Sequence, residues 1–350
     1  MNIRPCWEVL RALWDGTASV RTVLLFWIIL ATGALASAET VTTSLSGGAD
    51  TFNLRPGNNT NPAATTISAT TAWSLSPPYN LNVYAYFLNS VAALTDGSGH
   101  NIPSSAFFIS VNGGNSTALT SNAANTAGFG GPNAGFTLDN INVQPVNKNS
   151  SVTDTMMFNL DLSALSQLPA GTYSGTLYIQ AQGTKGNAQV NSGALPITLT
   201  ATLPESLTVS LSGSSVTFSL TPGSATNPGN TTVTATTSWV MRPSRTTVGL
   251  YASFTSAAAA LTDGAGNNIP SSAFSISDNG GVATALTNTV LFGGANAGLQ
   301  LASVPITSAN ENSSRTDALS FNINLTGGTL PQLPAATYTG TLYIQAQTTP

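Results

Sequence analysis

Side chains that can carry out acid–base, nucleophilic or metal chemistry are rare in this sequence. The chain of 350 residues contains one histidine, His100, and one cysteine, Cys6. A catalytic triad or a zinc site needs several imidazole, thiol or carboxylate groups close together. The residue that matches His100 in a second, related stretch is Asn267. We therefore interpret His100 as a solvated turn residue, and we predict no catalytic residues, no enzyme activity and no cofactor.

Two similar loops carry an aspartate followed by glycines, Asp96-Gly-Ser-Gly and Asp263-Gly-Ala-Gly. A repeated aspartate suggests calcium, but Ca²⁺ takes about six to eight oxygen ligands, usually from several carboxylates. Each loop offers a single carboxylate, and Asp-Gly forms tight turns without any ion. We favour turns, and keep calcium binding by Asp96 and Asp263 as the alternative hypothesis; no other metal site is predicted.

Asp154 and Asp317 occupy matching places in the stretches NSSVTD and NSSRTD. A glycosidase would need a second carboxylate facing each of them, and none recurs near them in sequence. We predict that both aspartates hold loops through hydrogen bonds from the side chain to the backbone.

Two tyrosines are the candidates for ligand binding. Tyr178 and Tyr343 lie in matching LYIQAQ stretches, where they alternate with the apolar residues on either side. If the apolar residues face a core, the tyrosines face outward and can stack on sugar rings. The alternative interpretation is packing between neighbouring strands. Trp73 and Trp239, also a matching pair, are predicted to lie in the core.

The composition excludes several classes of function. Charged residues are 6% of the chain, against about 25% in typical proteins. Nucleic-acid binding needs clustered lysine and arginine that displace counterions, so we predict no nucleic-acid partner. Hydrophobic residues are 41% of the chain, which predicts a folded core rather than disorder.

The N-terminal segment has the plan of a secretory signal. Arg4, Arg11 and Arg21 precede an apolar run at residues 23–30, and Ala36-Ser-Ala38 follows it. This order of basic, apolar and small residues predicts a signal peptide over 1–38, cleaved after Ala38. The alternative is an uncleaved segment that anchors the chain in a membrane. We expect a secreted or cell-surface protein, and cleavage would remove Cys6 and with it any disulfide.

The rest of the sequence is a duplication. LPAGTYSGTLYIQAQ at 168–182 returns as LPAATYTGTLYIQAQ at 333–347, and Trp73 matches Trp239 at a shift of 239 − 73 = 166. This period is far longer than the units of about 20–50 residues that build solenoids, and it suits a whole domain. We predict two domains, at 40–205 and 206–350, called here the first and second repeat.

Each repeat shows the period of two that is typical of strands. Met156, Phe158, Leu160 and Leu162 share one face, with Thr155, Met157, Asn159 and Asp161 on the other, and the same alternation holds at 67–75 and 177–181. Clusters of Gly, Pro, Asn and Asp separate these runs, as turns require. We therefore predict an all-β fold, with each repeat a sandwich of two antiparallel sheets.

The stretch LPAGTYSGTLYIQ resembles the start of the sixth strand in fibronectin type III and immunoglobulin-like sandwiches. That resemblance implies a tyrosine corner, in which the hydroxyls of Tyr173 and Tyr338 bond back to the preceding loop. The longer pattern resembles secreted bacterial repeat proteins of immunoglobulin-like or pilin-like type. These resemblances imply two tandem immunoglobulin-like antiparallel β-sandwich domains after the signal peptide, and no particular activity.

The two repeats differ after the shared YIQAQ strand. In the first, residues 194–203 predict a seventh strand, whereas only Thr348-Thr-Pro350 follows in the second. Three explanations stay open: an incomplete reading frame, a domain complete without that strand, or a sheet edge that takes a strand from another subunit, as pilins do. Residues 39–46 are a possible donor but match 206–212, and are more simply a first strand.

Together these features predict an exported, non-enzymatic structural or adhesive protein of the cell surface or extracellular space. The alternative hypothesis is a pair of carbohydrate-binding modules, and an enzyme is the third. The expected partners are other subunits that add a strand, or a surface polysaccharide.

Overall fold

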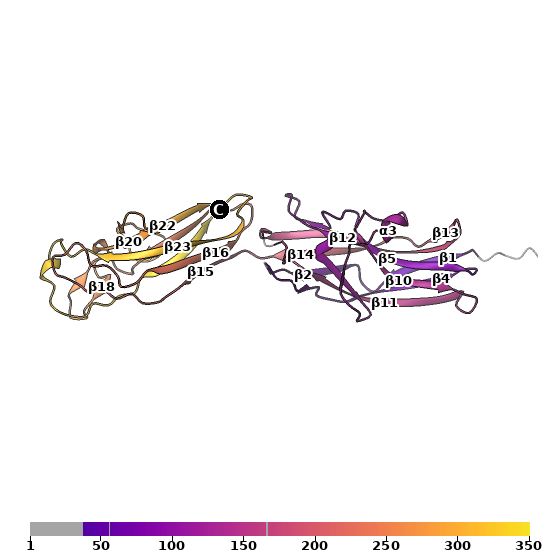
Figure 1. Cartoon of the computed structure of the whole chain (residues 1–350), viewed down its shortest axis with the longest axis horizontal. Coiled ribbons are helices and arrows are strands. Elements are labelled where there is room, and N and C mark those ends of the chain that lie inside the picture. The colour runs from indigo at the N-terminus through magenta and orange to yellow at the C-terminus, as the bar shows by residue number, and fades with distance from the viewer. Residues whose placement is uncertain (1–37, 56, 166) are drawn as a thin grey trace, which may run out of the picture.

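The computed structural model of the protein describes residues 38–55, 57–165 and 167–350. Figure 1 shows two elongated bodies joined end to end, the first repeat in indigo and magenta and the second in orange and yellow. The predicted signal peptide lies outside the described residues except for Ala38. Within the described ranges, no helix is long and apolar enough to cross a bilayer. Strands dominate both bodies, so the predicted all-β class is confirmed.

The first sheet of the first repeat is antiparallel throughout and follows the order β1-β4-β11-β8-β9, with β3 beside β11. Its strands are β1 (Thr40–Leu45), β3 (Asn61–Pro62), β4 (Ile67–Ser74), β8 (Phe107–Val111), β9 (Thr117–Ala118) and β11 (Asn149–Leu160). Alternation explains the central strands, since every second residue of β4 is buried, from Ile67 to Trp73. β1 pairs with β4 as a first strand, so residues 40–45 are not free to be donated within this molecule.

The second sheet of the first repeat follows the order β10-β5-β12-β14-β2. Its strands are β2 (Ala49–Asn53), β5 (Tyr79–Tyr86), β10 (Gly135–Val143), β12 (Gly171–Lys185) and β14 (Leu195–Leu203), with β6 (Leu94–Thr95), β7 (Asn101–Ile102) and β13 (Ala188–Asn191) at its margins. The predicted seventh strand is thus confirmed as β14. Pairing is antiparallel except between β14 and β2, which run parallel, so the expectation of purely antiparallel sheets was wrong for this edge.

The second repeat rebuilds the first sheet but not the second. Order β15-β16-β23-β20-β21 matches the first sheet above, while the other sheet contains β22-β17-β24 only, and β18 pairs with β19. The strands are β15 (Ser206–Leu211), β16 (Val233–Val240), β17 (Thr247–Ser253), β18 (Leu261–Thr262), β19 (Asn268–Ile269), β20 (Phe274–Asp278), β21 (Thr284–Ala285), β22 (Gly298–Pro305), β23 (Asn312–Ile323) and β24 (Tyr343–Thr349).

Helical structure is confined to single turns in the described part of the chain. These are η1 (Ser104–Ala106), α3 (Ala123–Thr126), η2 (Ser271–Ala273) and η3 (Leu330–Gln332). The turns η1 and η2 occupy matching places in the two repeats and share the sequence SSA, which the duplication explains.

The predicted core tryptophans and tyrosine corners are in place. Trp73 and Trp239 are buried, and each indole Nε1 donates a hydrogen bond of 2.8 Å to a loop carbonyl, Asn147 O or Asn310 O. The hydroxyl of Tyr173 donates to Pro169 O at 2.8 Å, and that of Tyr338 donates to Pro334 O at 3.0 Å. The same tyrosine-to-carbonyl hydrogen bond therefore holds the loop that precedes β12 in the first repeat and the loop that precedes β24 in the second.

Candidate functional site

In the first repeat, two strands close the second sheet around the YIQAQ strand. β14 pairs antiparallel with β12 from Gly171↔Leu203 to Ile179↔Leu195, and β2 pairs with the far side of β14. The inward residues of β14 are fully hidden: Ile197, Leu199 and Ala201 are each 0% exposed. β14 thus supplies both main-chain hydrogen bonds and apolar side chains to the core.

The second repeat contains the same YIQAQ sequence in β24, but no strand that matches β14 lies beside it among the described residues. β24 begins only at Tyr343 and pairs with β17 on one side; among the described residues it has no strand on the other. Residues 336–342, which match the first half of β12, form no strand, and their backbone pairing in the described chain is limited to a bridge between Thr339 and Thr262. The N–H and C=O groups along this stretch are available to another strand.

A second segment loses its strand for the same reason. Phe218 matches Phe52 at the shift of 166, so residues 215–219 match β2, but in the second repeat they pair only through a bridge between Phe218 and Gly229. β2 owes its pairing to β14. The described residues of the second repeat include no strand that matches β14, and the two segments that would flank such a strand are irregular.

Apolar side chains that are sealed in the first repeat are partly exposed in the second. Leu177 and Ile179 are 0% exposed, whereas their counterparts Leu342 and Ile344 are only partly buried. We call the resulting feature the open edge, and it comprises the partly buried residues Val216, Phe218, Leu220, Tyr338, Leu342 and Ile344. No charged residue occurs in 213–220 or 336–349, so the open edge suits an uncharged, apolar strand.

The structure places the two predicted sugar-binding tyrosines in different surroundings. The ring of Tyr178 stacks on Tyr86 with a centroid distance of 5.6 Å, which engages one of its faces within the sheet. Tyr343 is 44% exposed at the start of β24. The residue opposite it on the neighbouring strand is Ser253, whereas the residue opposite Tyr178 is Tyr86. Cross-strand packing therefore applies to Tyr178, while sugar binding by either tyrosine stays a prediction.

The Asp-Gly loops are closed by their own hydrogen bonds. Oδ1 of Asp96 accepts from the backbone N–H groups of Ser98 and His100, and Asp263 accepts the same pair of bonds in its loop. In the described chain, no group of three or more His, Cys, Asp or Glu side chains is placed to hold a metal. Calcium would compete with these N–H donors for the same oxygens, and calcium binding by Asp96 and Asp263 stays a prediction.

His100 is not the solvated turn residue that the sequence predicts. Its side chain is 24% exposed, with Nδ1 at 2.7 Å from Asp96 Oδ2 and Nε2 at 3.3 Å from Glu311 Oε2. Glu311 belongs to the second repeat, more than two hundred residues away, so no local pattern could indicate this contact.

The buried aspartates Asp154 and Asp317 act differently from the prediction of side chain-to-backbone bonds. Asp154 accepts a hydrogen bond of 3.0 Å from the side chain of Asn112, whose own Oδ1 accepts from Thr155 N. Asn279 repeats this arrangement with Asp317 at 3.1 Å. Both asparagines have positive φ, 52° and 49°. The aspartates therefore lock strained turns through an asparagine relay, and burial raises the pKa of Asp154 despite the bond from Asn112.

No protein-family model and no curated protein matches the chain. Among solved structures, it is similar to the CooA pilin subunit of enterotoxigenic Escherichia coli, with 19% identity and a TM-score of 0.29, over 47% of this chain and 98% of that one. It is also similar to the CsuC–CsuE chaperone–tip adhesion subunit complex from the Csu pili of Acinetobacter baumannii, with 11% identity and a TM-score of 0.39, over 89% of this chain and 100% of that one.

A third similar structure is the CupB6 tip adhesin of Pseudomonas aeruginosa, with 12% identity and a TM-score of 0.34, over 89% of this chain and 95% of that one. With these TM-scores below 0.5, the function has to be argued from the open edge itself.

Proposed function

We propose that the protein is an exported, non-enzymatic structural or adhesive component of the cell surface or extracellular space, and that its two repeats are separate domains. Its second repeat takes up a strand from another protein subunit at the open edge. The observation that carries the proposal is the difference between β12 and β24, which share the sequence YIQAQ. β14 covers the first, and the second is partly exposed.

Strand addition suits this edge because the edge offers both main-chain hydrogen-bonding groups and partly exposed apolar side chains. Residues 336–342 offer main-chain groups that β12 uses to pair with β14 in the first repeat. In the first repeat, the counterparts of Phe218 and Leu342 lie opposite two inward residues of β14, Ala201 and Ile197. An added strand gains affinity from main-chain hydrogen bonds and specificity from alternate side chains.

The first repeat shows which strand fits. β14 has the sequence LPITLTATL, and its residues are alternately exposed or half-exposed and buried. By homology, the donated strand runs antiparallel to residues 336–344 and parallel to 215–219. It carries aliphatic residues at every second position and no charge, since the open edge has no charged residue to pair with one.

A synthetic peptide provides the test. We expect a peptide with the sequence of residues 194–203, ALPITLTATL, to bind the purified chain with one-to-one stoichiometry and a micromolar dissociation constant by calorimetry. Hydrogen exchange should then slow at residues 336–342 and 215–219. The peptide should also suppress self-association of the chain, because it covers the edge through which copies would pair.

The control peptide replaces the inward Ile197 and Leu199 by asparagine and keeps every outward residue. It retains the main-chain groups but buries amides in an apolar site, so binding should be lost. Equal binding of both peptides, or binding with no change in exchange at the open edge, contradicts the proposal.

A further inference from the structure

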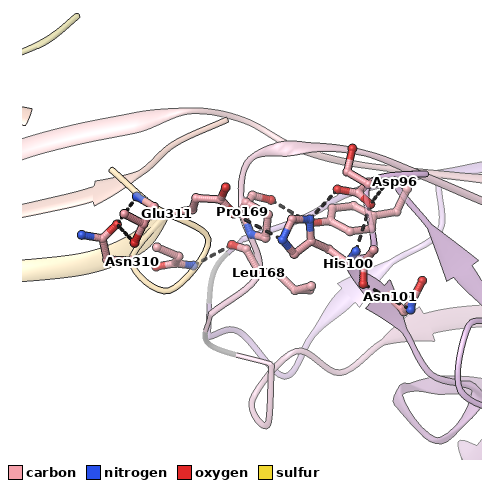
Figure 2. Close-up of polar contacts among 12 residues, drawn as sticks. Asp96, His100, Asn101, Leu168, Pro169, Asn310 and Glu311 are labelled. Atoms are coloured by element: carbon pink, nitrogen blue, oxygen red, sulfur yellow. Dashed lines mark hydrogen bonds and ion pairs between the residues drawn. The ribbon is translucent and has the colours of Figure 1, made fainter. Parts of the chain in front are cut away.

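The place where the two repeats meet combines apolar and polar contacts. Val240 of the second repeat packs into the core of the first, and a small set of polar contacts lies beside it. Ala170 N donates to Met241 O at 3.0 Å, and the side chain of Asn312 donates to Leu168 O at 2.9 Å. Leu168 and Ala170 flank Pro169, whose carbonyl is fastened by the tyrosine corner of Tyr173. Figure 2 shows this loop of the first repeat facing the loop of Asn310 and Glu311 from the second.

His100 adds a contact that spans the two repeats. Its ring lies between Asp96 of its own loop and Glu311 of the second repeat, at 2.7 Å and 3.3 Å (Figure 2). The Glu311 side chain is 5% exposed, and apart from its ion-pair contact with His100 Nε2 its Oε2 atom has no hydrogen-bond partner among the described residues. A buried carboxylate oxygen without a hydrogen bond destabilises the folded chain unless a proton or a nearby cation neutralises its charge.

The second repeat contains the same loop without a histidine. Asn267 donates to Asp263 Oδ2 at 2.6 Å, as Nδ1 of His100 contacts Asp96 Oδ2, and the two backbone bonds to each aspartate are also shared. The loop fold therefore needs only one donor at this position. The second nitrogen of His100 is not needed to close the loop, and it is the atom that reaches Glu311.

The partners of the two His100 ring nitrogens determine which of these nitrogens carries a hydrogen. Burial raises the pKa of Asp96, but the hydrogen bonds from His100 and from backbone N–H groups outweigh it and leave the pKa below its ordinary value. Asp96 is therefore ionised and only accepts, so Nδ1 carries a hydrogen. Nε2 then attracts Glu311 only when a proton lies on Nε2 or on Oε2. Without that proton, a nitrogen lone pair faces a carboxylate.

We propose that this single proton, shared between His100 Nε2 and Glu311 Oε2, tightens the orientation of the second repeat relative to the first, and that its loss as pH rises loosens the joint. The device belongs to the joint and does not depend on strand addition at the open edge.

The other titratable groups around the ring support the same direction. Burial raises the pKa of Glu311, the charge of His100 lowers it and that of Asp96 raises it, with a net rise. Tyr173 also has a raised pKa, through burial and then the charges of Asp96 and Glu311, so it stays neutral. A raised acid pKa retains the proton to higher pH. The contact is therefore present in acid solution, persists to higher pH than an ordinary carboxyl would allow, and is lost as pH rises further.

Distances between spin labels test the joint in the full chain. Thr153 and Thr316 are exposed and occupy matching places on β11 and β23, so labelled cysteines there report one repeat against the other. Repeats without a large apolar interface move freely. We therefore expect a narrow distance distribution at about pH 6 and one roughly twofold wider at about pH 9.

Two variants separate the proton from the fold. His100→Asn copies the second repeat, keeps the Asp96 loop and should give the wide distribution at both pH values. Glu311→Gln can donate its amide hydrogen to Nε2 without the shared proton, and should give the narrow distribution at both. Identical widths for the native chain and His100→Asn at each pH overturn the proposal, as does unchanged pH dependence in Glu311→Gln.

Discussion

The sequence LPAGTYSGTLYIQAQ leads into a strand of 15 residues in the first repeat, β12, whereas LPAATYTGTLYIQAQ leads into one of 7 residues in the second, β24. The missing part is the half of the strand that pairs only with β14 and the short strand β6 in the first repeat, residues 171–177. Local sequence is almost the same in both copies. What differs is the neighbour, so strand formation here is a property of the pair of strands rather than of either sequence.

The same comparison separates the two cores. In the first repeat, residues of β12 and β14 that face inward are completely buried. In the second, Leu342, Ile344 and Phe218 are only partly buried, and each retains free energy that burial would release. The first repeat therefore contains its own closing strand, whereas the described part of the second leaves the matching apolar side chains partly exposed.

Giving the second repeat its own closing strand should have the largest effect. We expect a variant in which residues 183–203 replace Thr348–Pro350 to raise the free energy of unfolding of the second repeat on the order of 5 kcal/mol. The segment carries the connection that β13 and β14 use in the first repeat, so its inward side chains reach the open edge in the same register. Denaturant unfolding followed by hydrogen exchange, which resolves the two repeats, measures the change.

The matched control carries the same segment with asparagine at the positions of Ile197 and Leu199. It should leave residues 336–342 as exchangeable as in the native chain. The ALPITLTATL peptide should no longer bind the graft that carries the native segment. Equal stability of graft and control would contradict the view that the two repeats differ in stability because the second has no strand next to residues 336–342.

Truncating matched leucines should have a smaller effect that differs between repeats. Leu177→Ala leaves a cavity in a sealed site and should cost about 3 kcal/mol in the first repeat. Leu342→Ala removes a partly exposed side chain and should cost about 1 kcal/mol in the second.

Hydrogen exchange of each repeat in denaturant measures both costs. Saturation with the ALPITLTATL peptide should raise the cost of Leu342→Ala towards that of Leu177→Ala. Equal costs in the free chain would contradict the difference in burial on which the open edge rests.

Much of this comparison could be predicted from the sequence, because it depends on alternation. The buried residues of β11 and β14 and the core tryptophans follow from period-two patterns and turn residues. The tyrosine corners follow from the resemblance of LPAGTYSGTLYIQ to immunoglobulin-like sandwiches. The irregularity of residues 215–219 could not, because β2 owes its pairing to a parallel neighbour that lies about 150 residues further along. The contact of His100 with Glu311 joins loops of different repeats, and the asparagine relay of Asp154 depends on backbone φ, so neither leaves a local pattern.

The smallest expected difference concerns the tyrosine corners. Tyr173 is 0% exposed and donates its hydroxyl to Pro169 O, so Tyr173→Phe leaves a buried carbonyl without that donor and should cost about 1–2 kcal/mol. Tyr338→Phe should have no measurable effect, because water can replace the hydroxyl near the exposed contact with Pro334. The first variant carries a further consequence that the second lacks. The loop it loosens also contacts the second repeat through Leu168 and Ala170, so spin-label distances should broaden in Tyr173→Phe alone. Broadening in both variants, or in neither, would separate the tyrosine corner from the joint and leave His100 as the contact to examine.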